Sequence, residues 1–282
     1  MGASPLDAAL LAAQFPDLTG ITYVTGGGQK WVYTATHAKH GTVALKVFSD
    51  FTQRTPREVE AVQKIACPHV PEIFATGFLT SGSQRYFWLL EPWLHGDNLR
   101  TRLAAGALSD ELVLLVARDV LCALSAAEKN RIVHRDVKPE NIYINSANTK
   151  CWLLDFGIAR HLERSTLTRA GAGQGPLSAG YAPPEQIQNY KDKIDSRTDL
   201  FALGVTLYEA LMGVNPFTLG TTDPNEILRR VMNTELPRPI RDIDPDRRFS
   251  DLVMVMTRSR RSLRPRTALK TYEWLAALRA SP

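Results

Sequence analysis

One stretch of this 282-residue chain, residues 134–141, constrains its fold more than any other. It reads His-Arg-Asp-Val-Lys-Pro-Glu-Asn, and Asp-Phe-Gly follows at residues 155–157. An apolar run of helical period, residues 112–127, precedes the stretch, and two short strand-like runs follow it at residues 142–144 and 151–154. The pattern predicts a helix, a loop and a hairpin whose far end returns to the loop.

Such a loop would gather two acids, a lysine and an amide around one point: Asp136, Asp155, Lys138 and Asn141. Phosphoryl transfer needs these groups, because carboxylate and amide oxygens hold a divalent metal, a cation faces the moving group and an acid accepts the proton of the nucleophile. The residues therefore indicate phosphoryl transfer. An ordinary helix-loop-hairpin with surface charges is the alternative.

The octapeptide resembles the catalytic loop of protein kinases, and residues 155–157 resemble their magnesium-binding triplet. The resemblance covers about residues 21–278 and is to the eukaryotic-like (Hanks-type) serine/threonine kinases; we expect a bacterial source. It implies an α+β class and a bilobal protein-kinase fold. The N-lobe would hold a small antiparallel β-sheet with one helix, and the C-lobe would be mainly helical.

The implied organisation is a lead-in helix within residues 1–20 and a kinase domain over residues 21–282, with an N-lobe at 21–91, a hinge at 91–96 and a C-lobe at 97–282. Hydrophobic period and turn residues predict the individual elements. Strands are predicted at residues 21–24, 31–36, 43–47, 73–78 and 86–91. Helices are predicted at residues 6–15, 56–65, 109–130 and 199–212, and from residues 224 and 267 onward.

The turn between the first two strands is rich in glycine, which permits close backbone approach to an anion. Aligning Val32 with the valine of the kinase glycine loop places Thr25, Gly27 and Lys30 at its three glycine positions. From this departure we expect the backbone to cover the phosphates less closely and nucleotide affinity to be lower, with Lys30 supplying a compensating charge. A plain hairpin turn is the alternative. The residues expected to cover the phosphates are Thr25, Gly26, Gly27, Gly28, Lys30 and Val32.

Lys46 lies in an apolar strand, where an ammonium is costly unless it meets an anion. The strand resembles the kinase strand whose lysine meets the nucleotide phosphates and a helix glutamate, with Ala44 beside the nucleotide. Alignment favours Glu58 as the partner of Lys46. A lysine on the solvated face of an edge strand is the alternative.

Residues 91–94 resemble the kinase hinge. The resemblance implies that Glu91 and Trp93 lie beside adenine, with Trp93 offering backbone groups and Leu90 guarding the back of the pocket. Asp97 falls where the family places a ribose contact, and it could equally be the N-cap of a helix.

The resemblance also assigns the catalytic roles, with ATP and Mg²⁺ as cofactors. Asp155 and Asn141 would hold the magnesium ion. Asp136 would orient the attacking hydroxyl and accept its proton, and Lys138 would meet the γ-phosphate. Asp199 would brace the backbone of the catalytic loop.

Residues 181–185 resemble the kinase A-P-E segment. Glu185 is expected to form a buried, structural pair with Arg264. Lys138 favours serine/threonine kinases over tyrosine kinases. Arg135, where small-molecule phosphotransferases carry glycine, suggests pairing with a phosphorylated residue of the activation segment. Candidate sites of autophosphorylation are Ser165, Thr166 and Thr168. Ser178 matches a family position nearer the substrate, and its expected role is positional.

Two other readings remain open: a kinase-shaped binding module without turnover, and a kinase of a small metabolite. Three unclustered cysteines, Cys67, Cys122 and Cys151, indicate reduced thiols of a cytoplasmic protein. We expect a protein substrate, a homodimer for autophosphorylation in trans, no membrane segment in the chain and no nucleic-acid partner. The net charge of +5 is mild, and the arginines between residues 258 and 266 are interpreted as a solvated loop.

Overall fold

The computed structural model describes residues 6–27, 30–53, 55–156, 180–240 and 246–280. The chain forms two compact units, which we describe separately. The N-terminal unit comprises Met1–Gln63 and Pro71–His95, and the C-terminal unit comprises Lys64–Val70 and Gly96–Pro282.

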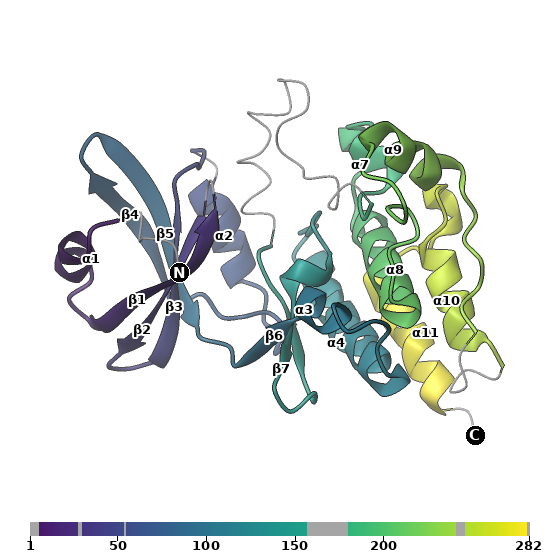
Figure 1. Cartoon of the computed structure of the whole chain (residues 1–282), viewed down its shortest axis with the longest axis horizontal. Helices are drawn as coiled ribbons and strands as arrows, with labels where there is room; N and C mark the ends of the chain where they lie inside the picture. Colours follow the sequence, from purple (N-terminus) through teal and green to yellow (C-terminus); the bar gives the residue numbers. More distant parts are fainter. Residues whose placement is uncertain (1–5, 28–29, 54, 157–179, 241–245, 281–282) are drawn as a thin grey trace. The chain divides into compact units, whose positions relative to one another are not determined.

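The N-terminal unit is built on a five-stranded antiparallel sheet with strand order β1-β2-β3-β5-β4 (Figure 1). The strands are β1 Leu18–Gly27, β2 Lys30–His37, β3 Gly41–Phe48, β4 Ala75–Ser81 and β5 Gln84–Pro92. Two helices accompany the sheet, α1 Ala8–Gln14 and α2 Thr55–Gln63. The sheet confirms the fold expected for the smaller lobe.

The two faces of this sheet have different partners. Alternate residues of β3, among them Val43, Leu45 and Val47, join one hydrophobic core with Leu11 and Phe15 from the α1 segment. The intervening residues of β3 point to the opposite face, because successive side chains of a strand alternate. Every residue of β3 from Val43 to Phe48 is buried, so both faces are covered.

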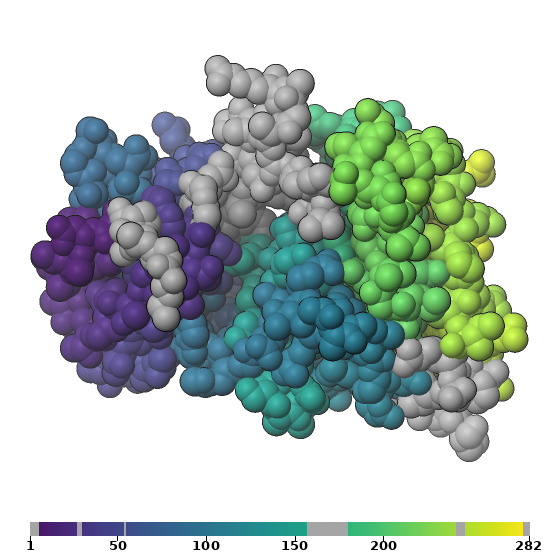
Figure 2. All heavy atoms as spheres, in the orientation of Figure 1, coloured from purple at the N-terminus to yellow at the C-terminus, as the bar shows by residue number. Residues whose placement is uncertain are grey.

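The C-terminal unit is mainly helical, as expected. Its strands, β6 Gly96–Asn98, β7 Ile142–Asn145 and β8 Cys151–Leu153, form a small antiparallel sheet. Its helices are α3 Leu99–Leu103, α4 Asp110–Lys129, α7 Pro184–Ile187, α8 Ser196–Met212, α9 Pro224–Asn233, α10 Arg248–Met256 and α11 Ala268–Ala280. The 3₁₀ turns among its described residues are η1 Pro139–Asn141, η2 Lys191–Lys193 and η3 Arg261–Leu263. In Figure 2, α9 (green) lies on the outer surface of this unit.

Helix α8 forms the centre of the C-terminal unit. Nearly all of its residues are buried, and Asp195 caps its N-terminus by accepting a hydrogen bond from the Arg197 N–H. It packs closely on α10 at Gly204, where an added Cβ would lie 2.8 Å from the Met256 Cβ. The helix ends at Gly213, whose φ of 77° suits glycine.

The structure corrects three details of the sequence analysis. Helix α10 was not predicted. The N-cap of α3 is Asn98, whose side chain accepts from the Thr101 N–H at 2.8 Å, so Asp97 is not a cap. The arginine-rich segment is not simply a solvated loop, because η3 forms within it and the Arg264 side chain is buried.

The cysteines are free thiols, as predicted. Cys151 is buried, and the Cys67 and Cys122 Sγ atoms lie 3.8 Å apart. Burial raises the pKa of the Cys67 thiol to about 11. Among the described residues, no helix is both long enough and apolar enough to cross a membrane.

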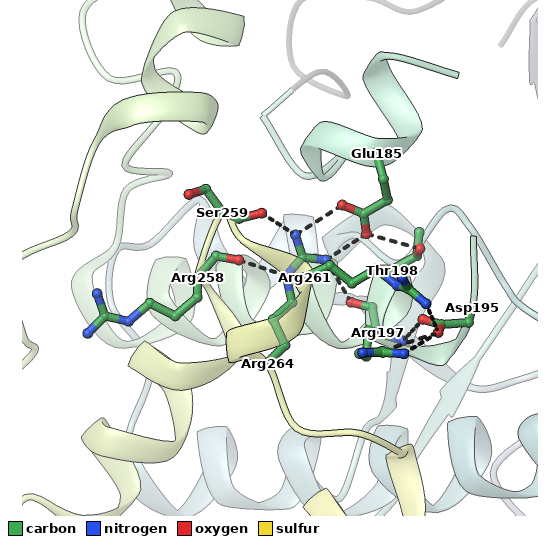
Figure 3. A network of polar contacts seen from close by, with 8 residues as sticks. All are labelled: Glu185, Asp195, Arg197, Thr198, Arg258, Ser259, Arg261 and Arg264. Carbon is green, nitrogen blue, oxygen red and sulfur yellow. Dashed lines mark hydrogen bonds and ion pairs between the residues drawn. The ribbon is translucent and has the colours of Figure 1, made fainter. Parts of the chain in front are cut away.

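The predicted pair of Glu185 and Arg264 is confirmed (Figure 3). The two guanidinium nitrogens of Arg264 donate to the two carboxylate oxygens of Glu185 at 2.6 and 3.0 Å. The side chains are 0% and 4% exposed, and Thr198 adds a hydroxyl hydrogen bond to Glu185. Burial lowers the pKa of Arg264 despite the favourable carboxylate. This pair joins α7 to the C-terminal end of η3.

Arg264 also donates to three backbone carbonyls, those of Arg197, Arg258 and Ser259 (Figure 3). Nearby, Asp195 accepts from Arg197 and Arg261. Burial alone would raise the pKa of Asp195, but the hydrogen bonds from both arginines hold it below its ordinary value. The network joins α7, α8 and η3.

We expect Arg264→Met to lower the free energy of unfolding by about 3–5 kcal/mol, because it leaves the Glu185 carboxylate buried without its cation. Urea denaturation followed by circular dichroism measures the loss. Arg258→Met is the matched control. Its pair with Glu235 is exposed, so the cost should stay below about 1 kcal/mol. Equal losses in the two variants would contradict the structural role of Arg264.

Candidate functional site

The loop between α4 and β7 gathers three of the predicted site residues. Lys138 Nζ lies 2.9 Å from Asp136 Oδ2, and Asn141 Nδ2 donates to that oxygen at 2.9 Å and to the Asp136 carbonyl at 2.8 Å. Turn η1 supports this geometry, since the Asn141 N–H donates to the Lys138 carbonyl at 3.0 Å. One carboxylate oxygen therefore receives hydrogen bonds from both a cation and an amide.

His134 ties this loop to the segment that contains Asp155. Its Nδ1 accepts from the Asp136 N–H at 3.2 Å, which leaves the ring proton on Nε2 to donate to the Leu154 carbonyl at 2.8 Å. The ring also packs edge-on against Phe156 at a centroid distance of 4.6 Å. His134 is fully buried, so it is an internal connection between the two predicted motifs. No separate role for His134 was predicted from the sequence.

The end of the hairpin is held as predicted. The Leu154 N–H donates to the Asn141 carbonyl at 2.8 Å, and β7 pairs with β8 from Ile142 to Ile144. Asp155 follows directly with a φ of 58°, a conformation that few residues adopt outside functional or strained positions. Its neighbours on both sides are therefore fixed to the loop that carries Asp136.

Asp199 of α8 holds the backbone of the loop, as we expected. Its two carboxylate oxygens accept from the backbone N–H groups of His134 and Arg135, at 2.7 and 2.6 Å. Asp199 is 3% exposed, and Arg135 has a φ of 66°. The buried carboxylate satisfies two adjacent amides whose backbone departs from regular structure.

The donor set suits a magnesium ion. Asn141 uses its Nδ2 for Asp136, so its Oδ1 is the group left to act as a ligand, and Asp155 offers a carboxylate. Mg²⁺ prefers oxygen ligands of both kinds. We therefore keep Asn141 and Asp155 as the proposed metal ligands.

Several predicted nucleotide residues share one face of the N-terminal sheet. In the β2–β3–β5 register, Val32 lies opposite Lys46 and Lys46 opposite Leu89, while Ala44 lies opposite Glu91. Residues opposite one another across a sheet point to the same side. Val32, Ala44 and Lys46 thus lie together, as their predicted roles require.

Lys46 is 5% exposed, on a strand between two others, which excludes the solvated edge-strand reading. Its Nζ lies 2.6 Å from Glu91 Oε1. Glu91 was predicted to lie in the hinge, and this contact was not predicted. Glu58, half-buried, lies in the first turn of α2, and its pairing with Lys46 remains a prediction.

Leu90 does not lie where we expected. It is opposite Leu45 in the register and belongs to the core on the α1 face of the sheet, away from the face that holds Lys46. Leu90 therefore cannot guard a pocket beside Lys46, and Glu91 and Leu89 occupy that face. The Trp93 N–H, expected to serve adenine, donates to the Thr42 carbonyl at 3.1 Å.

The glycine-rich turn is partly described. Thr25, Gly26 and Gly27 belong to β1 and pair with Val32, Trp31 and Lys30 of β2, whereas Gly28 lies outside the described residues. A Cβ on Gly26 would lie 2.6 Å from the Trp31 ring and 2.7 Å from the Lys30 carbonyl. The hairpin itself therefore requires glycine here, and this requirement accounts for Gly26 without a ligand.

Asp97, the predicted ribose contact, lies in β6 and pairs with Arg102 at 3.2 Å. Other expected residues fall outside the described part of the chain: Gly157, Ser165, Thr166, Thr168 and Ser178.

A second polar cluster was missed. Arg100 of α3 donates to Glu140, two residues after Lys138, at 2.8 Å and to Glu209 of α8 at 2.6 Å. It also donates to the Tyr181 hydroxyl, which itself donates to Glu209. Burial and the Glu209 carboxylate raise the pKa of Tyr181. No local sequence pattern predicts contacts between residues that are so distant in sequence.

Comparison with known proteins gives the same picture. A family model described as "Protein kinase domain" matches residues 24–274. Probable serine/threonine-protein kinase pknA2 of Bifidobacterium longum is 33% identical over 206 residues, which cover 69% of this chain and 26% of that protein. Serine/threonine-protein kinase PknD of Mycobacterium tuberculosis is 32% identical over 216 residues, covering 73% of this chain and 31% of that protein.

Probable serine/threonine-protein kinase CPE1738 of Clostridium perfringens is 30% identical over 237 residues, 81% of this chain and 33% of that protein. This chain spans about a quarter to a third of the length of these three relatives. Their bacterial organisms agree with the source that we expected.

We predict that Asp199→Asn speeds hydrogen exchange at the His134 and Arg135 amides about ten- to hundredfold, because an amide cannot replace both accepting carboxylate oxygens. Amide exchange read by mass spectrometry or NMR measures the change, with amides of α4 as an internal reference. Asp251→Asn, a surface variant, is the matched control and should leave both amides unchanged. Unchanged exchange in Asp199→Asn would show that the loop is held by other contacts.

Proposed function

Since the chain belongs to the protein kinase family, we propose that it is an ATP- and Mg²⁺-dependent kinase that transfers the γ-phosphate of ATP to serine and threonine hydroxyls of proteins. The observation that carries this proposal is that Lys138 and Asn141 both contact one carboxylate oxygen of Asp136. Asp199 and His134 hold the loop that carries these residues by accepting hydrogen bonds from its backbone N–H groups.

In this proposal, Asp136 orients the substrate hydroxyl and accepts its proton. Lys138 is already directed at Asp136 and would offset the charge that develops on the transferred group. Magnesium bound by Asn141 and Asp155 would neutralise phosphate charge. The chain forms no covalent intermediate, so positioning and electrostatics would supply most of the acceleration.

The N-terminal unit would supply the nucleotide contacts. Lys46 would bind the α- and β-phosphates, with Glu58 and the face that carries Val32 and Ala44 beside it. Thr25, Gly26, Gly27 and Lys30 would lie over the phosphates, and Leu89, Glu91 and Trp93 near adenine. Asp97 would contact the ribose.

A binding module without turnover is the second candidate. The irregular glycine turn and the Trp93 N–H, already bonded to Thr42, favour it. The complete set of catalytic side chains in the loop argues for turnover instead.

We also propose a protein substrate, no nucleic-acid partner and a cytoplasmic setting; the three free thiols support that setting.

We predict that Asp155→Asn and Asp136→Asn each lower phosphate transfer at least about a hundredfold, because one removes a metal ligand and the other the proton acceptor. Transfer of labelled γ-phosphate from Mg-ATP to the chain and to a basic protein substrate measures it. Asp251→Asn is the matched control and should keep full activity. No transfer by the unaltered chain, with ATP still bound, would favour the binding module.

Autophosphorylation is a separate prediction. After incubation with Mg-ATP, mass spectrometry should find phosphate on Ser165, Thr166 or Thr168, and none in Asp155→Asn. If a homodimer acts in trans, the unaltered chain should phosphorylate Asp155→Asn when the two are mixed, with an initial rate that rises with the square of concentration. Absence of phosphate between residues 164 and 178 in an active chain would contradict this regulation.

A further inference from the structure

The ion pair between Lys46 and Glu91 has no counterpart in the roles assigned so far. The two atoms, Lys46 Nζ and Glu91 Oε1, lie 2.6 Å apart, and the side chains are 7% and 10% exposed. The pair comes from adjacent strands, since Glu91 of β5 lies opposite Ala44, two residues before Lys46 on β3. The carboxylate therefore reaches the lysine diagonally across one face of the sheet.

Burial makes this contact durable. Separating two charges that water hardly reaches would leave each of them poorly solvated, which costs far more than separating an exposed pair. An ammonium carries three N–H donors, so a lysine bound to Glu91 can still donate to other acceptors. When a phosphate binds, burial therefore favours a lysine that contacts Glu91 and the phosphate at the same time. A lysine that leaves Glu91 for the phosphate is less favourable.

The scaffold of the pair is rigid. Strands β3 and β5 are paired without interruption from Val43 and Pro92 to Phe48 and Phe87. Both charged residues belong to this ladder, whereas Glu58 belongs to a separate helix, α2. The contact between Lys46 and Glu91 is therefore held by the strand ladder and not by α2.

We propose that Glu91 is a positioning residue for Lys46: it fixes the ammonium from the sheet, so that the lysine is preset for the nucleotide phosphates without depending on Glu58 alone. The inference rests on the proposed function, because it assigns Lys46 to the phosphates. It adds a role for the Glu91 side chain to the position near adenine that the hinge resemblance implied for this residue.

Phosphate-dependent binding tests the proposal. Calorimetry would compare ATP, ADP and adenosine on the full chain and on Glu91→Leu, Glu91→Gln and Glu91→Asp. We expect Glu91→Leu to weaken ATP and ADP binding about tenfold through loss of a charged hydrogen bond, with adenosine changed less than twofold. Glu91→Gln keeps an acceptor and should lose less, and Glu91→Asp should restore part of the affinity. Circular dichroism melts confirm that each variant is folded.

The direction of the effect is diagnostic. Removing a negative charge near bound phosphates would by itself strengthen ATP binding. Weaker binding therefore requires that Glu91 acts through Lys46. In Lys46→Met the further change Glu91→Leu should not weaken ATP binding any further, because the residue to be positioned is gone. Glu58→Leu is the matched comparison and should cost less than Glu91→Leu.

Three results would overturn the inference while leaving the kinase intact: unchanged or tighter ATP binding in Glu91→Leu, an equal loss for adenosine, or a full additional loss in Lys46→Met. In each case the unaltered chain still transfers phosphate from ATP. If the unaltered chain neither binds ATP nor transfers phosphate, the proposed function and this inference both fall.

Discussion

Two short hydrogen bonds connect the buried carboxylate of Asp199 to the backbone amides of His134 and Arg135. They transmit the position of α8, the most buried helix of the C-terminal unit, to the loop that carries Asp136. Because α8 is packed on α4 and α10, a shift of the loop would have to disturb the core. The charged and polar groups around Asp136 are thus held in place by the apolar packing of α8 elsewhere in the unit.

The sequence was sufficient for the parts of the site that lie close together in the chain. Lys138 and Asn141 reach Asp136 because all three belong to one loop, and a β-hairpin with recognisable strands returns to that loop. The long-range pairs that were predicted, Glu185 with Arg264 and Asp199 with the loop backbone, came from family resemblance. Periodicity and spacing alone would have left them unpaired.

Contacts that depend on strand register or on tertiary packing were beyond the sequence. Alternation along β5 shows that Leu90 and Glu91 face opposite ways, but only the pairing with β3 shows which of them faces Lys46. Helix α10 was not predicted because its apolar residues acquire their meaning only from packing against α8, where Met256 lies beside Gly204. The cluster of Arg100 with Glu140, Tyr181 and Glu209 joins parts of the chain with no common pattern.

The bond between Glu185 and Arg264 spans 79 residues and so sets an order of events during synthesis. A nascent chain that has emerged only as far as α8 carries Glu185 without its cation, which is still inside the ribosome. Gln186, the next residue, donates to the Arg135 carbonyl at 3.2 Å, so the loop with Asp136 is coupled to the same delay. The loop that carries Asp136 would therefore reach its final contacts only after Arg264 has been synthesised and has emerged.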